Sequence, residues 1–316
     1  MTTTNAAASY EWVIWIDRGG TFTDIIGRDG AGRTHSLKLL STSDAYEDAA
    51  VEGMRRLLGA QPGQPFPAER VAAIKMGTTV ATNALLERKG AKTLLVATRG
   101  FADALVLGDQ ARPDLFALDV VRPAPLYAGV VEADERLAAD GAVVAPLDRD
   151  ALLARLKQAA LDGYESAAVA FLHADLNPVH ELAAAELARE AGLSFVALSH
   201  QVSPLPRYVA RAETTVADAY LTPALQAYVQ RVARAVAGAP LYFMTSNGGL
   251  VRAETFRGKD AVVSGPAGGV VGVARTADAA GARAGHALEN SGTHSSARAD
   301  GRALMNESGP RSGTGA

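Results

Sequence analysis

A short segment near the N-terminus carries a combination of side chains that could hold a phosphate group. It contains two carboxylates, two threonines and two glycines within eight residues, in the order Asp17-Arg18-Gly19-Gly20-Thr21-Phe22-Thr23-Asp24. Glycines let the chain turn and let an anion approach backbone N–H groups where a Cβ would block it, and threonine hydroxyls add donors. The pattern predicts a phosphate-binding loop, and an ordinary β-hairpin with a glycine turn is the alternative.

The residues on either side of this segment are typical of strands. Residues 12–16 are β-branched or aromatic, and Ile25 and Ile26 resume that pattern after the glycines. Asp17 stands at the end of the first strand, where it could hold Mg²⁺ through the waters of the ion. We therefore assign the metal to Asp17 and the phosphate contacts to the remaining loop residues other than Phe22, namely Arg18, Gly19, Gly20, Thr21, Thr23 and Asp24.

A second segment, residues 76–88, places two threonines where a helix is expected to begin. Residues 71–75 are predicted to form a strand, and Gly77 opens a turn into a helix that ends at Gly90. Free N–H groups and the helix dipole would attract an anion at Thr78 and Thr79. Asn83 follows one helical turn later and could face the same cleft. The alternative is that one of the threonines only caps the helix.

A third segment, residues 264–272, is a small-residue helix start rich in glycine. Such a start can face a phosphate, and we assign Gly265, Gly268 and Gly269 to that role. It can also serve close packing of backbones. The long amphipathic helical region before it, which we expect to be broken at Pro223, is more typical of core packing than of a site.

The composition limits the class of protein. Of 316 residues, 48% are hydrophobic and 21% are charged, as in globular proteins, and the net charge of −3 without a basic block argues against nucleic acid. The absence of cysteine excludes disulfides and a cysteine nucleophile. His173, His180 and His200 show no ligand spacing. No signal peptide or apolar run of about 18 residues is visible, so we expect a cytoplasmic protein without a membrane partner.

Segments of this chain resemble the hydantoinase A/5-oxoprolinase family. The similar motifs are DRGGTFTD, GTTVATNALLER, SNGGL and SGPAGGVVG, and KLLS and EGMRRLLG resemble the 5-oxoprolinase branch. The resemblance implies an α/β fold, an actin-like or ribonuclease H-like ATPase lobe with an incomplete second lobe. The strand and helix alternation of residues 148–198 agrees with a layered α/β domain. It also implies ATP and Mg²⁺ as cofactors.

The resemblance further implies roles for particular residues and regions. Thr78, Thr79 and Asn83 would line the catalytic cleft with Asp17, and three polar side chains would orient a small polar substrate, namely Arg99, Gln110 and Arg112. Arginine suits carboxylate or phosphate, although loop arginines are often only solvated. We expect a disordered N-terminus over 1–11, an N-terminal family domain over 12–200, the start of a hydantoinase A domain over 201–280 and a disordered, aberrant tail over 281–316.

The implied activity is that of the N-terminal part of an ATP-dependent 5-oxoprolinase, which converts 5-oxo-L-proline, ATP and water into L-glutamate, ADP and phosphate. Alternatives are a hydantoinase or ketone carboxylase subunit, or a non-catalytic fragment that binds a partner. A second phosphate loop, expected after residue 280, is missing, and losing it would cost at least about a hundredfold in affinity. We therefore expect no competent ATPase from this chain alone, a hydantoinase B-type partner or domain, and an oligomer in the full-length form.

Overall fold

The computed structural model describes residues 11–61, 63–109, 116 and 123–280. The chain divides into two compact units, residues 1–267 and 268–316, and only residues 268–280 of the second are described. The predicted disordered tail and most of the predicted disordered N-terminus lie outside the described residues. The first unit contains the three β-sheets of the described residues and most of the candidate site residues.

A six-stranded mixed sheet contains the N-terminal motif. Three antiparallel strands form a meander, and the first of them pairs in parallel with a later strand. In sheet order the strands are β12 (Leu250–Arg252), β11 (Leu241–Met244), β4 (Val71–Thr78), β1 (Trp12–Arg18), β2 (Phe22–Arg28) and β3 (Thr34–Leu40). The neighbour of β4 is β11, which comes more than 160 residues later in the chain.

A four-stranded sheet is inserted in the chain between β4 and β11, and all of its strands are parallel. Its order is β10 (Phe195–Leu198), β9 (Ser166–Ala170), β5 (Thr93–Thr98) and β6 (Gly129–Ala133). Every residue of β5 and β9 is buried, as expected for a parallel sheet covered on both faces. The mixed α/β architecture confirms the predicted fold class. A small hairpin, β7 (Arg136–Leu137) and β8 (Val143–Ala145), follows β6.

The helices begin and end largely where local signals place them. Asp48 caps α1 (Ala49–Leu58) by accepting from the N–H groups of Ala50 and Val51, and Gly59 ends it with φ 67°. The other helices are α2 (Val80–Leu86), α3 (Ala104–Leu107), α4 (Arg149–Leu161), α5 (Val179–Glu190), α6 (Ser199–Val202), α7 (Tyr208–Ala235), α8 (Gly258–Ala261) and α9 (Ser264–Ala279), with 3₁₀ turns at Ala68–Arg70 and Ala253–Thr255.

Helix α7 corrects one prediction, because it continues through Pro223 for 28 residues. Proline removes one helical hydrogen bond and usually kinks or breaks a helix. Here packing on both sides of Pro223 compensates: Ala212 and Val216 belong to the core of the inserted sheet, and Leu225 and Val229 belong to the core of the six-stranded sheet. The burial of these side chains therefore outweighs the free-energy cost of a proline inside the helix.

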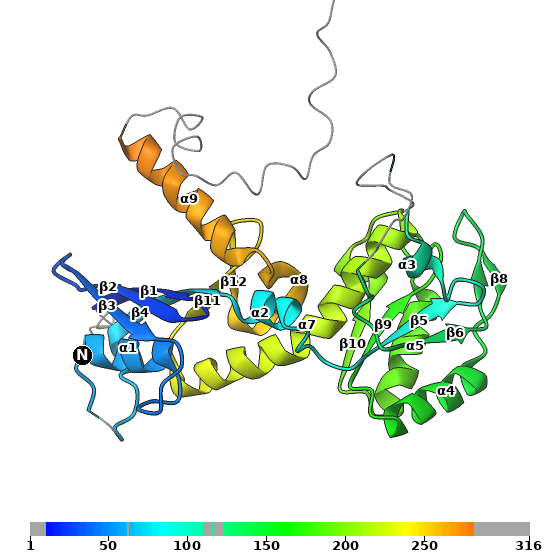
Figure 1. Cartoon of the computed structure of the whole chain (residues 1–316), viewed down its shortest axis with the longest axis horizontal. Helices are drawn as coiled ribbons and strands as arrows, with labels where there is room; N and C mark the ends of the chain where they lie inside the picture. The colour runs from blue at the N-terminus through cyan, green and yellow to red at the C-terminus, as the bar shows by residue number, and fades with distance from the viewer. Residues whose placement is uncertain (1–10, 62, 110–115, 117–122, 281–316) are drawn as a thin grey trace, which may run out of the picture. The chain divides into compact units, whose positions relative to one another are not determined.

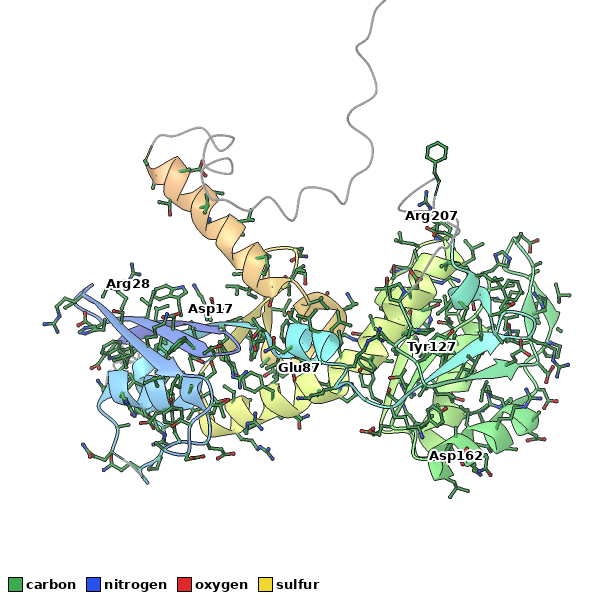
Figure 2. All side chains as sticks on the ribbon, viewed as in Figure 1. Asp17, Arg28, Glu87, Tyr127, Asp162 and Arg207 are labelled. Atoms are coloured by element: carbon green, nitrogen blue, oxygen red, sulfur yellow. The ribbon has the colours of Figure 1, made fainter. Side chains whose placement is uncertain are left out.

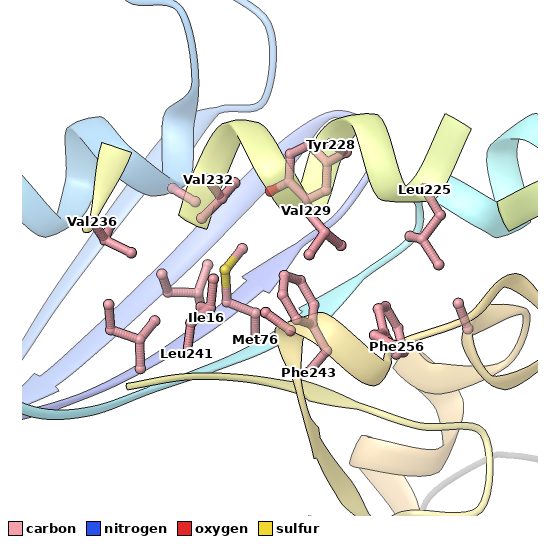
Figure 3. Packing of buried hydrophobic residues seen from close by; sticks show 14 of the residues in the cluster. Ile16, Met76, Leu225, Tyr228, Val229, Val232, Val236, Leu241, Phe243 and Phe256 are labelled. Carbon is pink, nitrogen blue, oxygen red and sulfur yellow. The ribbon is translucent and has the colours of Figure 1, made fainter. Parts of the chain in front are cut away.

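One face of the six-stranded sheet is buried by α1 and the C-terminal half of α7 (Figure 1). Ile16 and Met76 of the sheet pack against Tyr228 and Val232 of α7 (Figure 3). Because side chains alternate along a strand, the residues between these buried positions point to the opposite face. Asp17 consequently lies on the opposite face from Ile16 and is exposed.

Candidate phosphate-binding site

The predicted phosphate-binding segment forms the turn between β1 and β2. The N–H of Gly19 donates to the carbonyl oxygen of Phe22 at 3.0 Å and closes this turn. The strand register pairs Asp17 with Asp24 and Arg18 with Thr23, so each pair shares one face of the sheet. Figure 2 labels Asp17 at the end of β1. The segment is thus a β-hairpin, and what distinguishes it from an ordinary one is the surroundings of its tip.

The tip of the hairpin has free hydrogen-bond donors. Gly20 and Thr21 are exposed. Within the described chain, neither their backbone N–H groups nor the Thr21 hydroxyl has a hydrogen-bond partner. Consecutive free N–H groups beside a glycine form a concavity that suits an anion. The open face that a phosphate would need is therefore present.

The Asn83 side chain of α2 lies against the tip. A Cβ added to Gly20 would stand 3.3 Å from Asn83 Nδ2, which is a tight contact, so glycine keeps open the space between the hairpin and this amide. Asn83 Nδ2 also donates to Thr79 Oγ1 at 3.3 Å. The structure thereby brings Asn83 next to the phosphate loop, as the spacing within its segment predicts.

Thr78 and Thr79 lie at the start of α2, as predicted, but their polar groups have partners within the chain. The N–H and the hydroxyl of Thr79 both donate to the carbonyl oxygen of Arg18, at 3.1 and 3.2 Å. Thr78 is buried, and its Oγ1 accepts from the N–H of Val80 at 3.3 Å. The N–H of Thr79 is therefore not free, because it ties α2 to the hairpin, and the predicted roles of both threonines in a catalytic cleft stay predictions.

The side chains of two further loop residues are engaged away from the exposed tip, so their predicted phosphate contacts stay predictions. The Thr23 side chain is fully buried, and its hydroxyl shares a 2.9 Å hydrogen bond with Ser41, which in turn donates to the Gly19 carbonyl at 2.7 Å. Arg18 extends onto the covered face, where its guanidinium lies 4.8 Å from the ring centroid of Tyr228. Both side chains therefore brace the hairpin from within.

The Arg18 side chain lies in a largely apolar environment beneath the hairpin. Its Nε is 3.9 Å from Asp48 Oδ2, and burial raises the pKa of the neighbouring Tyr228 hydroxyl above its ordinary range. Arg18 Nε and Tyr228 Oη are buried without a hydrogen-bond partner among the described residues. The positive charge is thus held under the hairpin by an ion pair and an aromatic face.

The two carboxylates of the loop lie on the exposed face. Asp17 Oδ1 would stand 3.3 Å from a Cβ added to Gly77, so glycine at position 77 leaves room for this carboxylate. Asp24 is held by Lys38, whose Nζ donates to both carboxylate oxygens at 2.8 and 2.9 Å. Asp17 is therefore the carboxylate of the loop that is available to a cation.

The donor set around Asp17 suits a hydrated cation. In the part of the chain that the structure describes, no three His, Cys, Asp or Glu side chains cluster as a metal site would require. Mg²⁺ keeps several waters and binds through one or two carboxylates together with substrate phosphates. A single exposed carboxylate beside a phosphate cradle fits that ion better than one that needs several protein ligands.

The third segment reaches the site through Ser264. Its hydroxyl donates to the carbonyl oxygen of Thr78 at 3.1 Å, across 186 positions of sequence. Gly265 follows in the first turn of α9. Gly268 and Gly269 belong to the second compact unit, so their phosphate contacts stay predictions. Ser264 was missed by our sequence analysis, although a serine before Gly-Pro at a helix start is a usual signal.

The predicted substrate-binding residues are not assembled at the hairpin. Arg99 stands at the end of β5 in the inserted sheet, where its guanidinium pairs with Asp134 and the side chain is 60% exposed. Gln110 and Arg112 lie outside the described residues. The phosphate and substrate contacts therefore both remain predictions.

Two of the three histidines singled out in the sequence lie in a buried polar network of the inserted sheet. His180 Nδ1 is 2.7 Å from Glu135 Oε2, and His200 Nδ1 is 2.6 Å from Glu181 Oε2. Each histidine thus pairs with one buried carboxylate.

None of the described helices combines the length and the apolar character required to cross a bilayer.

Comparison with protein-family models gives two matches. Residues 13–192 match the hydantoinase/oxoprolinase N-terminal region. Residues 211–299 match a second model, described as hydantoinase/oxoprolinase. The second match extends beyond residue 280, where our sequence analysis placed the end of the resemblance.

Several curated proteins are similar over most of this chain. The 5-oxoprolinase of Saccharomyces cerevisiae is 38% identical over 303 residues, which cover 83% of this chain and 24% of the relative. The 5-oxoprolinase 1 of Arabidopsis thaliana is 41% identical over 292 residues, covering 83% and 23%. The caprolactamase subunit alpha of Pseudomonas jessenii is 32% identical over 272 residues, covering 81% and 39%. This chain thus spans about a quarter of the length of the 5-oxoprolinases it matches.

Two solved structures share the fold. The ATP-dependent caprolactamase from Pseudomonas jessenii superposes with a TM-score of 0.71 and 31% identity, over 85% of this chain and 40% of that one. The nucleotide-free acetone carboxylase, studied for ATP-dependent acetone carboxylation, superposes with a TM-score of 0.71 and 23% identity, over 85% and 41%. The second similarity concerns the fold alone.

Proposed function

We propose, from the premise that this chain belongs to the hydantoinase/oxoprolinase family, that its hairpin binds the phosphates of ATP in an enzyme that opens a cyclic amide. The observation that carries this proposal is the open tip at Gly20 and Thr21, with its free donors, beside the Asn83 amide and the Asp17 carboxylate. The similar caprolactamase is ATP-dependent, and so is the acetone carboxylation studied in the protein that shares this fold.

The chemistry requires activation of an amide, because an amide carbonyl is a poor electrophile. ATP, when bound, would supply a phosphoryl group that makes the amide carbon electrophilic towards water, and Mg²⁺ would offset the phosphate charge. Ring opening then breaks the C–N bond, the ring nitrogen takes a proton, and phosphate leaves from the carbonyl carbon in the hydrolysis that follows. The N–H groups of Gly20 and Thr21 and the Thr21 hydroxyl would bind phosphate oxygens. Asn83 would add an amide donor, and Asp17 would hold the hydrated metal.

The residues behind the tip keep this geometry. Thr79 fixes the distance between α2 and the end of β1, since its N–H and hydroxyl both bind the Arg18 carbonyl. Ser41 binds the Gly19 carbonyl and Thr23, so the hairpin cannot easily collapse into the space that the anion needs. Such preorganised donors stabilise charge without reorganisation during the reaction.

The substrate that we propose is 5-oxo-L-proline. The support is the identity of 38% and 41% to two 5-oxoprolinases over 83% of this chain. A larger lactam is the second candidate, because the caprolactamase subunit alpha is 32% identical. We further propose that the enzyme is cytoplasmic, works with a hydantoinase B-type subunit or domain and forms an oligomer.

A hybrid enzyme tests the proposed function. Residues 12–280 would replace the matching segment of the 5-oxoprolinase of Saccharomyces cerevisiae, and ADP release would be measured with 5-oxo-L-proline, caprolactam and no lactam. We expect release that depends on 5-oxo-L-proline and on Mg²⁺. Asp17→Asn should abolish the activity or raise its Mg²⁺ requirement, whereas the matched change Asp24→Asn should have little effect because Asp24 is already paired with Lys38. A hybrid that folds and hydrolyses neither lactam would refute the proposal.

A further inference from the structure

The start of α8 is held by two fully buried polar side chains of α7, Asp218 and Thr222. Asp218 Oδ1 accepts from the Thr222 hydroxyl at 2.9 Å and from the N–H of Lys259 at 3.1 Å. Asp218 Oδ2 accepts from Nη2 of Arg257 at 2.6 Å. Thr222 Oγ1 in turn accepts from the N–H of Gly258 at 2.9 Å. Three consecutive residues at the start of α8 are thus bound to one pair of side chains.

The backbone of α8 also sits directly on α7. A Cβ added to Gly258 would stand 2.7 Å from Leu221 Cβ and 2.8 Å from the backbone nitrogen of Thr222. Real side chains do not approach so closely, so glycine is required at this crossing. Glycine at position 258 therefore allows α8 to approach α7 this closely.

The chain leads from α8 directly into the candidate phosphate site. The carbonyl oxygen of Val262 accepts from the Thr82 hydroxyl of α2 at 2.5 Å. Two residues later, Ser264 donates to the Thr78 carbonyl at 3.1 Å. The position of α8 therefore sets where Ser264 meets the segment of β4 and α2 that carries Thr79 and Asn83.

The polar pair on α7 is poorly explained by stability alone. Asp218 is fully buried and Arg257 is 27% exposed, and an ion pair that buries a carboxylate usually gives little net stabilisation, because desolvation offsets the attraction. Arg257 Nε is moreover buried without a hydrogen-bond partner among the described residues. An apolar contact would hold two helices together at least as well. What the polar pair adds is a fixed register of α8 on α7.

We propose that Asp218 and Thr222 are positioning residues for the phosphate site: they fix α8 and thereby hold Ser264 against Thr78. The expected effect on phosphate affinity rests on the proposed function, whereas the expected effect on hydrogen exchange of the chain does not. Loss of the pair releases the segment 258–264 from α7, and the link between Thr78 and α9 loosens with it. Helix α2, which carries Asn83 beside the tip of the hairpin, then loses one of its supports.

The test compares Thr222→Val, which keeps the shape and removes the hydroxyl, with Thr222→Ser, which restores it. Asp218→Asn is the second variant in case the first fails to fold. Thr215→Val is the matched control, because Thr215 is equally buried on α7 and its hydroxyl, among the described residues, binds only the carbonyl of Arg211 in its own helix. Hydrogen exchange of residues 257–265 is measured by mass spectrometry, together with the affinity for inorganic tripolyphosphate by calorimetry and the melting temperature.

The expected result is faster exchange over 257–265 and a three- to tenfold weaker affinity in Thr222→Val, about the effect of one lost hydrogen bond. Thr222→Ser should restore both, and Thr215→Val should change the melting temperature without changing the affinity. Unchanged exchange in Thr222→Val and Asp218→Asn would overturn the inference, as would faster exchange with unchanged affinity. If the parent chain binds no tripolyphosphate, the proposed function fails separately, and the exchange result alone decides whether the pair positions this segment.

Discussion

Substitution of Gly20 tests the phosphate site most directly. In Gly20→Ala the added Cβ would stand 3.3 Å from Asn83 Nδ2, in the space between the hairpin and α2. The backbone of Gly20 has no positive φ, so alanine fits its conformation. The methyl group therefore blocks the approach of an anion and leaves the fold intact.

The expected loss follows from the number of donors that the methyl group obstructs. A hydrogen bond to a charged group contributes about 1.5–3 kcal/mol, so the loss of one weakens binding roughly ten- to hundredfold. The effect on folding is small, since Gly→Ala at a compatible site changes stability by about 1 kcal/mol or less. Gly20→Ala should thus weaken anion binding with little change in the free energy of unfolding.

The assay is isothermal titration calorimetry with Mg·ATP and, separately, with tripolyphosphate, which lacks the adenosine. Gly30→Ala is the matched control, because it lies in the turn between β2 and β3 and its added Cβ would come no closer than 3.6 Å to another atom. We expect weaker binding of both ligands to Gly20→Ala and no change in Gly30→Ala. Equal affinity of the parent and Gly20→Ala for tripolyphosphate would refute the assignment of the tip as the anion site.

Three further predictions concern the scaffold and are checked by chemical denaturation. Gly90→Ala should destabilise by about 3 kcal/mol, because its Cβ would stand 2.2 Å from the ring of Tyr220. Arg211→Met should cost about 3–5 kcal/mol, since this side chain is 1% exposed and its removal leaves buried acceptors unpaired. The hydrogen bond from His35 lowers the pKa of Asp29 well below its ordinary value of 3.8. The stability that Asp29→Asn removes should therefore be present above that value and vanish as the pH falls below it.

Much of the local structure could be predicted because it depends on neighbours in the chain. Residues 12–16 form a strand, Gly19 and Gly20 form a turn, and Gly59 ends α1, each by local conformational preference. The spacing between Thr79 and Asn83 places them on one side of α2 for the same reason. These features need no information about the rest of the fold.

The assignment of individual loop side chains required the packing. Thr21 and Thr23 are equivalent in sequence terms, yet one is exposed at the tip and the other is buried against Ser41. Which face of a strand is buried depends on the helices that cover it, here α1 and α7. For the same reason the Arg18 side chain lies on the covered face of the sheet, although its positive charge suits phosphate.

By itself the sequence determined the loop type, its family and the elements on either side, because glycines, caps and alternating strands act over a few residues. Only the tertiary structure decided that Ser264 meets Thr78, that α7 continues through Pro223 and that β11 pairs with β4. Those outcomes depend on contacts between residues as far as 186 positions apart. Such contacts arise from the joint burial of several elements, and no local preference encodes them.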